Sequence, residues 1–167
     1  EPVTLNLLSS LNLSGITPFA SGDAAGRLVL HRIRSMWSAE GRVQTESIEE
    51  AMLERSWTGH ALRVCKFGQL GSMPVRGWFP FAAAEDRAAT VTWAVQLACP
   101  SSWMMELRRK DDCLNLMAGL PDEDYGHWAK TIRPGEQFKT PEAFLTAGQG
   151  GVDEVSQRLL TVQLRNM

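Results

Sequence analysis

Thr90–Ala98 reads TVTWAVQLA, and large apolar side chains alternate along it with small or polar ones. In an extended chain successive side chains point to opposite faces, so one face of this segment is apolar. That face carries Val91, Trp93, Val95 and Leu97. The opposite face carries Thr92, Ala94 and Gln96. The alternation predicts a half-buried β-strand, and the rest of the chain is interpreted outward from it.

The following segment has the same alternation. In Ser102–Arg108 every second residue from Trp103 to Leu107 is large and apolar. Only Cys99-Pro100-Ser101 separates the two segments, and this link is too short for the helical crossover that joins parallel strands. We therefore expect the two segments to pair as an antiparallel hairpin.

Other short segments also have the composition of strands. They are bounded by glycine and proline residues that favour turns. The segments are Val3–Leu7, Leu11–Leu13, Leu28–Ile33 and Leu114–Met117. Short strands at this spacing predict an all-β fold, specifically an antiparallel β-sandwich.

The C-terminal segment has a different period. In Val152–Leu164 the apolar residues recur on one face of a helix, at Val152, Val155, Leu159 and Val162. Asp153 and Glu154 suit the first turn, because carboxylates there interact favourably with the helix dipole. The pattern predicts a C-terminal helix.

Two further segments give mixed signals. Ser47–Arg55 begins with Ser47 and Glu50 at the spacing of a helix capping box, but its residues also alternate. We favour a strand there, because the neighbouring segments are strands. Gly59–Asp86 is rich in glycine, proline and aromatic residues, and only Ala61–Phe67 within it resembles a strand. Long irregular segments in compact domains are often functional.

Size and charge exclude several classes of protein. The chain has 167 residues, 44% of them hydrophobic and 22% charged, which suits one compact domain with a sizeable core. The net charge of −2 provides no basic field for nucleic acid or an anionic membrane surface. No segment approaches the roughly 20 apolar residues that cross a bilayer. The chain begins at Glu1, which we take as a processed start or a cut end, so its cellular location stays open.

No group of residues has the spacing of a catalytic or metal site. Acidic residues occur together as Glu85-Asp86, Asp111-Asp112 and Asp122-Glu123-Asp124, and we interpret them as solvated turn carboxylates. The three histidines lie in unrelated segments, and there is no G-x-S-x-G nucleophile motif. We therefore predict no catalytic residue, no metal and no cofactor in this chain.

The cysteines suggest a reduced protein. Cys65, Cys99 and Cys113 are odd in number and widely spaced. We favour three free thiols, because a domain of this length rarely needs a disulfide. One disulfide with one cysteine left over remains the alternative.

Tryptophan is the residue type with the clearest functional potential. The chain contains 6 Trp, and the faces of these rings can stack on sugar rings. We expect Trp93 and Trp103 in the core, because both fall on apolar strand faces. For Trp37, Trp57 and Trp128 we expect a place in the core or in a domain contact. Trp78 lies in Pro74–Phe81, a loop with two prolines, and suits either a hydrophobic anchor or a ligand contact.

Around these residues the sequence is similar to a known family. The segments concerned are Trp37–Gly41, Ser56–His60, Phe67–Pro74 and Trp78–Phe81. They resemble the N-terminal region of the glycoside hydrolase family 36 α-galactosidases. Arg133–Glu142 looks like the proline-glycine-glutamate turn that leads to the barrel in that family. The motifs occur in the family's order and span the chain from about Leu28 to Leu164.

The resemblance implies a supersandwich-like β-sandwich that precedes a (β/α)8 catalytic barrel. Residues 1–167 would then form one β-sandwich domain or fragment, ending in a helical linker towards the barrel. In the family, two aspartates of the barrel carry out retaining hydrolysis of terminal α-galactosides. This chain contains none of the barrel, so it should be inactive alone.

The resemblance also implies partners and a site. The partners would be the catalytic barrel, an α-galactoside at the domain edge and further copies of the chain in a homo-oligomer. Loops of this domain can reach the mouth of the active site, and we assign substrate binding to Gln69, Ser72, Arg76 and Trp78. Two alternatives stay open, a stand-alone carbohydrate-binding or lectin-like module and a purely structural interaction domain.

Overall fold

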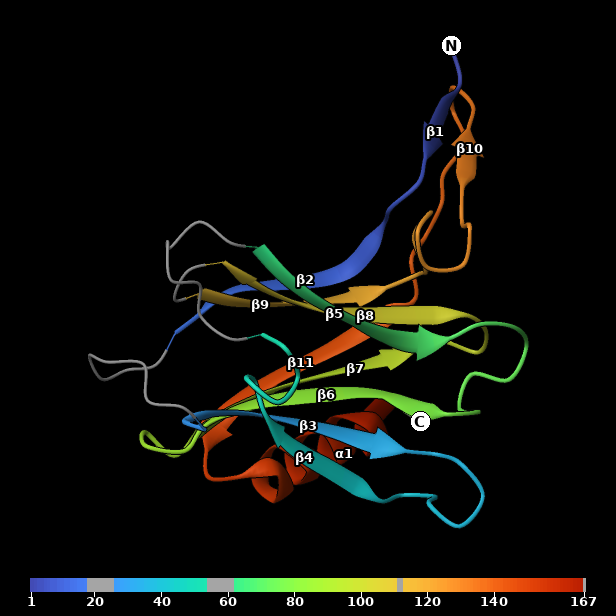
Figure 1. Cartoon of the computed structure of the whole chain (residues 1–167). Helices are drawn as coiled ribbons and strands as arrows, with labels where there is room; N and C mark the ends of the chain where they lie inside the picture. The colour runs from blue at the N-terminus through green and yellow to red at the C-terminus, as the bar shows by residue number, and fades with distance from the viewer. Residues whose placement is uncertain (18–25, 54–61, 111–112, 167) are drawn as a thin grey trace.

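The computed structural model describes residues 1–17, 26–53, 62–110 and 113–166. Two antiparallel sheets face each other, a C-terminal helix covers the outer side of one sheet, and a two-stranded arm projects from the sandwich (Figure 1). The all-β antiparallel sandwich with a C-terminal helix is therefore confirmed. Among the described residues, no helix is long and apolar enough to cross a membrane.

The larger sheet has five strands in the order β11-β7-β6-β3-β4. Its strands are β3 (Leu28–Arg34), β4 (Val43–Ser47), β6 (Trp78–Asp86), β7 (Val91–Ala98) and β11 (Glu142–Gln149). The smaller sheet has four strands in the order β2-β9-β8-β5. Its strands are β2 (Ser9–Ile16), β5 (Leu62–Gln69), β8 (Trp103–Lys110) and β9 (Cys113–Gly119).

The core lies between the two sheets. Each strand contributes its alternate apolar residues, as the sequence pattern requires. The residues with no exposed surface include Leu30, Ala84 and Val95 from the larger sheet and Trp103, Leu107 and Leu116 from the smaller one. Trp103 is thus in the core as predicted, and Trp93 packs against the core while partly exposed.

The predicted hairpin between the two alternating segments is wrong. β7 belongs to the five-stranded sheet and β8 to the four-stranded sheet, so the link between Ala98 and Trp103 crosses from one sheet to the other. Both strands direct their apolar faces into the shared core from opposite sides. Alternation shows which face is buried, but it does not show which sheet a strand joins.

The strand β7 is also buried on both faces, not on one. Helix α1 (Val152–Asn166) lies on the outer face of the five-stranded sheet (Figure 1). Its residues Val155 and Leu159 form a second apolar cluster with Ala94 and its neighbours on β6. Thr92 has no exposed surface, and its hydroxyl donates a hydrogen bond of 2.7 Å to the carbonyl oxygen of Gly150. The helix itself is confirmed, although Val162 on its predicted apolar face is 44% exposed.

Both segments that gave mixed signals differ from the prediction over their described residues. Ser47 ends β4, and the chain then turns instead of continuing as a strand. The capping-box contacts do form, since the amide of Ser47 donates to the Glu50 carboxylate at 2.7 Å. Trp78–Asp86, expected to be irregular, is the central strand β6. Pro80 is tolerated because the pairing with β3 shifts register there and β7 pairs only from Phe81 onward.

The arm is the remaining element. β1 (Val3–Leu5) pairs with β10 (Lys130–Ile132), so the predicted strand from Val3 ends two residues early. The two strands extend away from the sandwich, with the N-terminus at the far end (Figure 1). Trp128 lies on this arm and contacts Phe138 at 6.1 Å between ring centroids, so it is not a core residue.

Candidate functional site

The four candidate substrate-binding residues lie at one end of the sandwich. β5 ends at Gln69, β6 begins at Trp78, and the intervening loop 70–77 carries Ser72 and Arg76, which are both exposed. Gln69 is half-buried and its amide donates to the carbonyl oxygen of Leu70 at 2.7 Å. All four residues are thus on, or directly beside, one loop that joins the two sheets.

The core holds this loop in place. The indole nitrogen of Trp103 donates to the carbonyl oxygen of Pro74 at 2.5 Å, and Trp103 itself is completely buried. The amide of Gly71 donates to the hydroxyl of Ser102 at 2.8 Å. Contacts from Trp103, the first residue of β8, and from Ser102 just before it therefore anchor the loop, so its exposed side chains stand on a fixed backbone.

Trp78 packs against arginines. The guanidinium carbon of Arg34 lies 3.7 Å from the centroid of the Trp78 ring, and that of Arg32 lies 4.5 Å from it. Phe67 meets the ring edge-on at 5.7 Å. These contacts match the anchor alternative for Trp78. A sugar ring would stack on Trp78 only after displacing a guanidinium group that the ring already attracts.

Arg32 brings charge into the apolar interior beside Trp78. It is 8% exposed and forms an ion pair with Glu46, while its Nε atom has no hydrogen-bond partner among the described residues. Burial raises the pKa of the neighbouring Cys65 thiol, partly opposed by the positive charge of Arg32. Cys65, Cys99 and Cys113 are all free, as favoured from the sequence.

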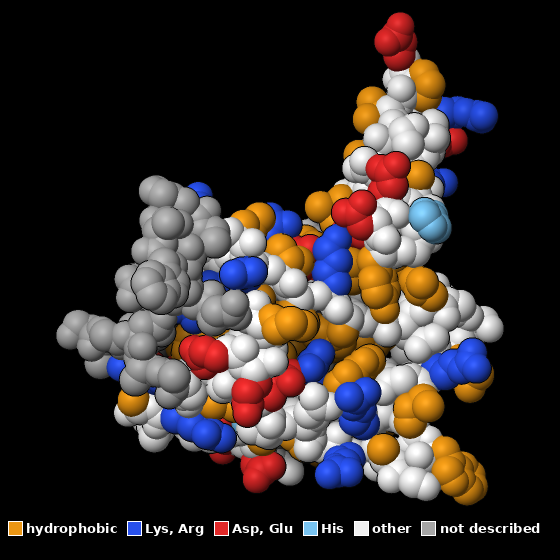
Figure 2. All heavy atoms as spheres, viewed as in Figure 1, with side chains coloured by type: hydrophobic (Ala, Val, Ile, Leu, Met, Phe, Trp, Pro, Cys, Tyr) orange, Lys and Arg blue, Asp and Glu red, His pale blue; other side chains and the backbone are white. Residues whose placement is uncertain are grey.

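The same end of the molecule exposes a cluster of large apolar side chains. β3 and β4 are joined by loop 35–42, and Arg34 at its start pairs with Trp78 at the end of loop 70–77. A hydrogen bond of 3.2 Å from the amide of Ser35 to the carbonyl oxygen of Gly77 links the two loops. Their exposed large apolar residues, which we call the apolar end, are Met36, Trp37, Leu70, Met73 and Val75. Figure 2 shows hydrophobic side chains along this right-hand end of the molecule.

Trp37 is the most exposed member of the apolar end, at 90%. Its exposure excludes the core position and leaves the domain contact that was the other expectation. The hairpin loop was not predicted, because Val43–Ser47 was not identified as a strand; its turn residues Ser38 and Gly41 have φ values of 64° and 74°. The sequence did not indicate that the Trp37 side chain points outward, because the alternation of apolar and polar residues defines side-chain direction only within a strand.

The acidic segments, predicted to be solvated turn carboxylates, differ from one another. Glu123 and Asp124 are exposed in a turn as predicted, but Asp122 is 8% exposed and Glu85-Asp86 ends the strand β6. Asp86 has no exposed surface, and its carboxylate accepts hydrogen bonds from Arg27 at 3.1 and 3.2 Å. The Glu85 carboxylate accepts a hydrogen bond of 2.7 Å from Nε2 of His31. Buried carboxylates need such partners, and long-range pairing supplies them. The Asp111-Asp112 pair lies outside the described residues, as do Trp57 and His60.

One arrangement resembles a nucleophile, base and acid in series. His31 contacts the Thr45 hydroxyl at 2.9 Å through Nδ1 and the Glu85 carboxylate at 2.7 Å through Nε2. However, His31 is only 4% exposed, and all three side chains fall at cross-strand positions of one sheet, where such bonds stabilise pairing. Among the described residues no group of three or more His, Cys, Asp or Glu side chains is placed to hold a metal ion.

Over the described residues the fold is an antiparallel β-sandwich of a five-stranded and a four-stranded sheet, with a two-stranded arm and a C-terminal helix. Among solved structures, this fold occurs in α-galactosidases of family 36. The GH36 α-galactosidase AgaA from Geobacillus stearothermophilus matches with a TM-score of 0.65 at 15% identity, over 90% of this chain and 18% of that chain. The α-galactosidase from Lactobacillus brevis matches with a TM-score of 0.67 at 16% identity, over 94% of this chain and 19% of that chain.

A third match has the same character. It is the galactosidase domain of the α-galactosidase-sucrose kinase AgaSK, with a TM-score of 0.66 at 15% identity, over 93% of this chain and 19% of that chain. No family model and no curated protein sequence matches the chain. The resemblance to family 36 is therefore confirmed at the level of the fold, and this chain spans about a fifth of the length of the enzymes that share it.

Proposed function

We propose that this chain is the accessory N-terminal domain of an α-galactosidase-like glycoside hydrolase. The observation that carries the proposal is the fold, which matches enzymes of that family over 90% of this chain but over only 18% of theirs. The carboxylates inside the described sandwich are engaged in ion pairs with Arg27 and Lys66 or bonded to His31. Catalysis would then take place in a barrel outside this chain.

The apolar end supports a docking role. An exposed tryptophan at a loop tip, next to four other exposed apolar residues, is the composition of a protein contact and not of a solvated surface. A hollow of about 320 Å³ adjoins it between α1 and the five-stranded sheet, with Phe81 and Leu159 in its apolar lining. We assign the apolar end to contacts with the catalytic barrel or with a neighbouring subunit of a homo-oligomer.

Loop 70–77 has the second role in this proposal. Because Trp103 and Ser102 anchor its backbone, Ser72 and Arg76 can present a hydroxyl and a guanidinium group at fixed positions. We propose that these two residues, with Gln69 and Trp78 at the base of the loop, shape the substrate entrance. Trp78 would act there mainly by holding Arg34 against its ring.

Helix α1 completes the assignment. It follows directly on the last strand of the five-stranded sheet and packs on the outer face of that sheet. We propose that it leads the chain from the sandwich to the barrel, so that residues 1–167 act as one domain. The parent reaction would be hydrolysis of a terminal α-linked galactose with retention, through a covalent glycosyl intermediate. Variants of AgaA from Geobacillus stearothermophilus have been crystallised in complex with stachyose and with raffinose.

The proposal is tested by hydrolysis of a chromogenic α-galactoside. The full-length parent should be active and this chain alone should be inactive. Activity in this chain would overturn the proposal, and inactivity in both would favour a sugar-binding or purely structural sandwich. In the parent, Arg76→Gln should raise KM for raffinose with kcat nearly unchanged. A purely structural domain predicts instead that Trp78→Ala lowers stability or assembly and leaves KM as it was.

A further inference from the structure

The outer face of the four-stranded sheet bears polar residues in register. On the inner side its strands direct apolar residues into the core, so the alternate positions face outward. Across the sheet these outward positions pair as Lys66 with Glu106, Glu106 with Met117, and Met117 with Asn12. In a second row Arg108 pairs with Asn115. Side chains that pair in this way lie about 5 Å apart at Cβ, so the two rows form one continuous polar surface.

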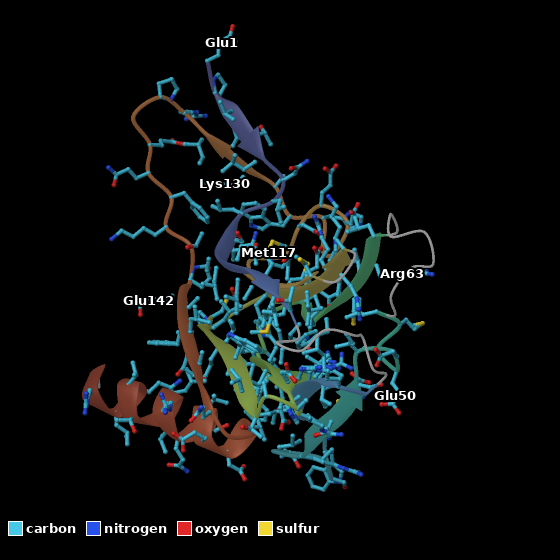
Figure 3. All side chains as sticks on the ribbon, turned by 90° about the vertical axis from the view of Figure 1, so that its left-hand side faces the viewer. Glu1, Glu50, Arg63, Met117, Lys130 and Glu142 are labelled. Atoms are coloured by element: carbon cyan, nitrogen blue, oxygen red, sulfur yellow. The ribbon has the colours of Figure 1, made fainter. Side chains whose placement is uncertain are left out.

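The foot of the arm turns this surface into a trough. Two hollows of about 370 Å³ and 220 Å³ adjoin there and share Leu7, Glu106 and Arg108 in their linings. The wall nearest the arm consists of Asn6 and the acidic segment Asp122–Asp124. In Figure 3 Met117 lies on the sheet below the arm that carries Lys130, and Figure 2 shows acidic and basic side chains gathered where arm and sandwich meet.

The polar groups of the trough are already held in place. Glu106 is only 3% exposed, and its carboxylate accepts a hydrogen bond from Nε of Arg108 at 2.9 Å. The ammonium group of Lys66 lies 2.5 Å from the Asp122 carboxylate and 3.6 Å from that of Glu106. These pairs use part of the capacity of each group, since a carboxylate has about four acceptor positions and a guanidinium group five donors. Glu106 and Arg108 line both hollows, and Lys66 and Asp122 line the larger one.

The chemistry of the lining selects the ligand class. Carboxylate, guanidinium and side-chain amide groups occur together, which suits hydroxyl groups that both donate and accept hydrogen bonds. The acidic residues outnumber Lys66 and Arg108, which disfavours phosphate or carboxylate ligands. Leu7 and Met117 add apolar surface for the C–H groups of a sugar ring. The larger hollow lies within the range of about 300–1,000 Å³ that is usual for small-molecule sites.

We propose that this trough is a binding site for a neutral oligosaccharide, separate from loop 70–77. The site lies on a sheet face that faces away from the core, whereas loop 70–77 joins the sheets at one end of the sandwich. The residues that line both hollows all belong to the described part of this chain. Failure of this proposal would therefore leave the proposed accessory role untouched.

The test is a titration of this chain with raffinose, followed by amide chemical shifts and by calorimetry. We expect saturable shifts at Arg108, Asn115 and Met117. Arg108→Gln should weaken binding about tenfold or more, because it removes charge-assisted hydrogen bonds. Arg165→Gln is the matched control, because Arg165 is exposed on helix α1, away from both the trough and loop 70–77, and it should leave the Kd unchanged. Thermal melting of both variants verifies that they are folded.

Three results would overturn the proposal. The first is no saturable shift at raffinose concentrations of tens of millimolar. The second is a set of shifts confined to loops 35–42 and 70–77, which would place sugar binding at the apolar end. The third is tighter binding of inorganic phosphate than of raffinose at the same residues, since that would assign the trough to anions.

Discussion

Replacing Asp122 with asparagine is expected to lower the free energy of unfolding by about 2 kcal/mol. Asp122 lies at the foot of the arm and joins it to the sheet through Lys66, with 2.5 Å between the charged atoms. Its other oxygen accepts a hydrogen bond of 2.6 Å from the amide of Tyr125. Asparagine keeps an oxygen for Tyr125 and the same shape, so the change removes essentially the charge.

The magnitude follows from the surroundings of the pair. The side chains of Asp122 and Lys66 are 11% and 23% exposed, so water screens their attraction less than it would at the surface. Hydrogen bonds to charged groups contribute about 1.5–3 kcal/mol, and breaking a fully buried pair costs about 3–5 kcal/mol. Lys66 keeps Glu106 at 3.6 Å after the substitution, so the expected cost lies in the range of about 1.5–3 kcal/mol and not in that of a fully buried pair. The melting temperature should fall by about 4–8 °C.

The dependence on pH gives the prediction its sharpest form. Partial burial alone would raise the pKa of Asp122, but the hydrogen bonds from Lys66 and the Tyr125 amide outweigh it and lower this pKa. Partial burial likewise opposes the raised pKa of Lys66, which the Asp122 contact produces. A lowered carboxyl pKa stabilises the fold above the unfolded value of about 3.9, and this stability is lost as the pH falls through the folded pKa. A raised lysine pKa stabilises below about 10.4, and this is lost as the pH rises through the folded value.

Urea denaturation of the wild type and the variant, across a series of pH values, measures the difference directly. The difference should be constant from about pH 5 to about pH 9 and should vanish in stronger acid. Asp124→Asn is the matched control, because the Asp124 side chain is 91% exposed and 3.7 Å from Lys66, and it should change stability little. Equal effects of the two variants, or a difference that persists at about pH 2, would refute the reasoning.

Three further outcomes are expected. Gly68→Ala should lower the free energy of unfolding by about 2–3 kcal/mol, as measured by urea denaturation. The new Cβ would lie 2.2 Å from the carbonyl oxygen of Trp103, so β5 and β8 would have to separate. Leu159→Ala should cost about 3 kcal/mol in the same assay, since Leu159 is 3% exposed on the face of α1 that packs on the sheet. A loss below about 1 kcal/mol would mean that the helix is loosely packed. In a thiol-labelling assay Cys113 should react in the native protein while Cys99 reacts only after unfolding, and equal rates would contradict the burial of Cys99.

The sequence predicted the elements of the fold better than their arrangement. β7, β8 and α1 were recognised because each has a regular apolar period. The hairpin between β7 and β8 was wrong because alternation defines a buried face and not a sheet partner. β6 was missed because Pro80 and the neighbouring aromatic residues resemble a loop, and only the shift in pairing beside β3 allows a strand there.

The candidate site was predictable as a location and not as a set of contacts. Gly59–Asp86 pointed to loop 70–77 through its glycines and prolines. The ring of Trp78 meets Arg34 only because two strands distant in sequence are paired. Lys66 of β5 meets Asp122, in the loop after β9, only because β5 and β9 both pair with β8. Exposure of Trp37 depends on which loops meet at one end of the sandwich. A single sequence carries no direct signal for such long-range encounters.

The strand order has a consequence for synthesis on the ribosome. β2 pairs with β9, so Leu13 has no partner until Leu116 has been synthesised. One edge of β3 likewise stays unpaired until β6 has been synthesised. Pairings between residues so distant in sequence make folding slow, because the chain loses the entropy of a long loop before the stabilising contacts form. We expect the hairpins β3–β4, β6–β7 and β8–β9 to form as they emerge, and the addition of β2 to the edge of β9 to be the late step. Until then the apolar residues of β2 are an exposed strand, open to chaperones or to the same strand of another nascent chain.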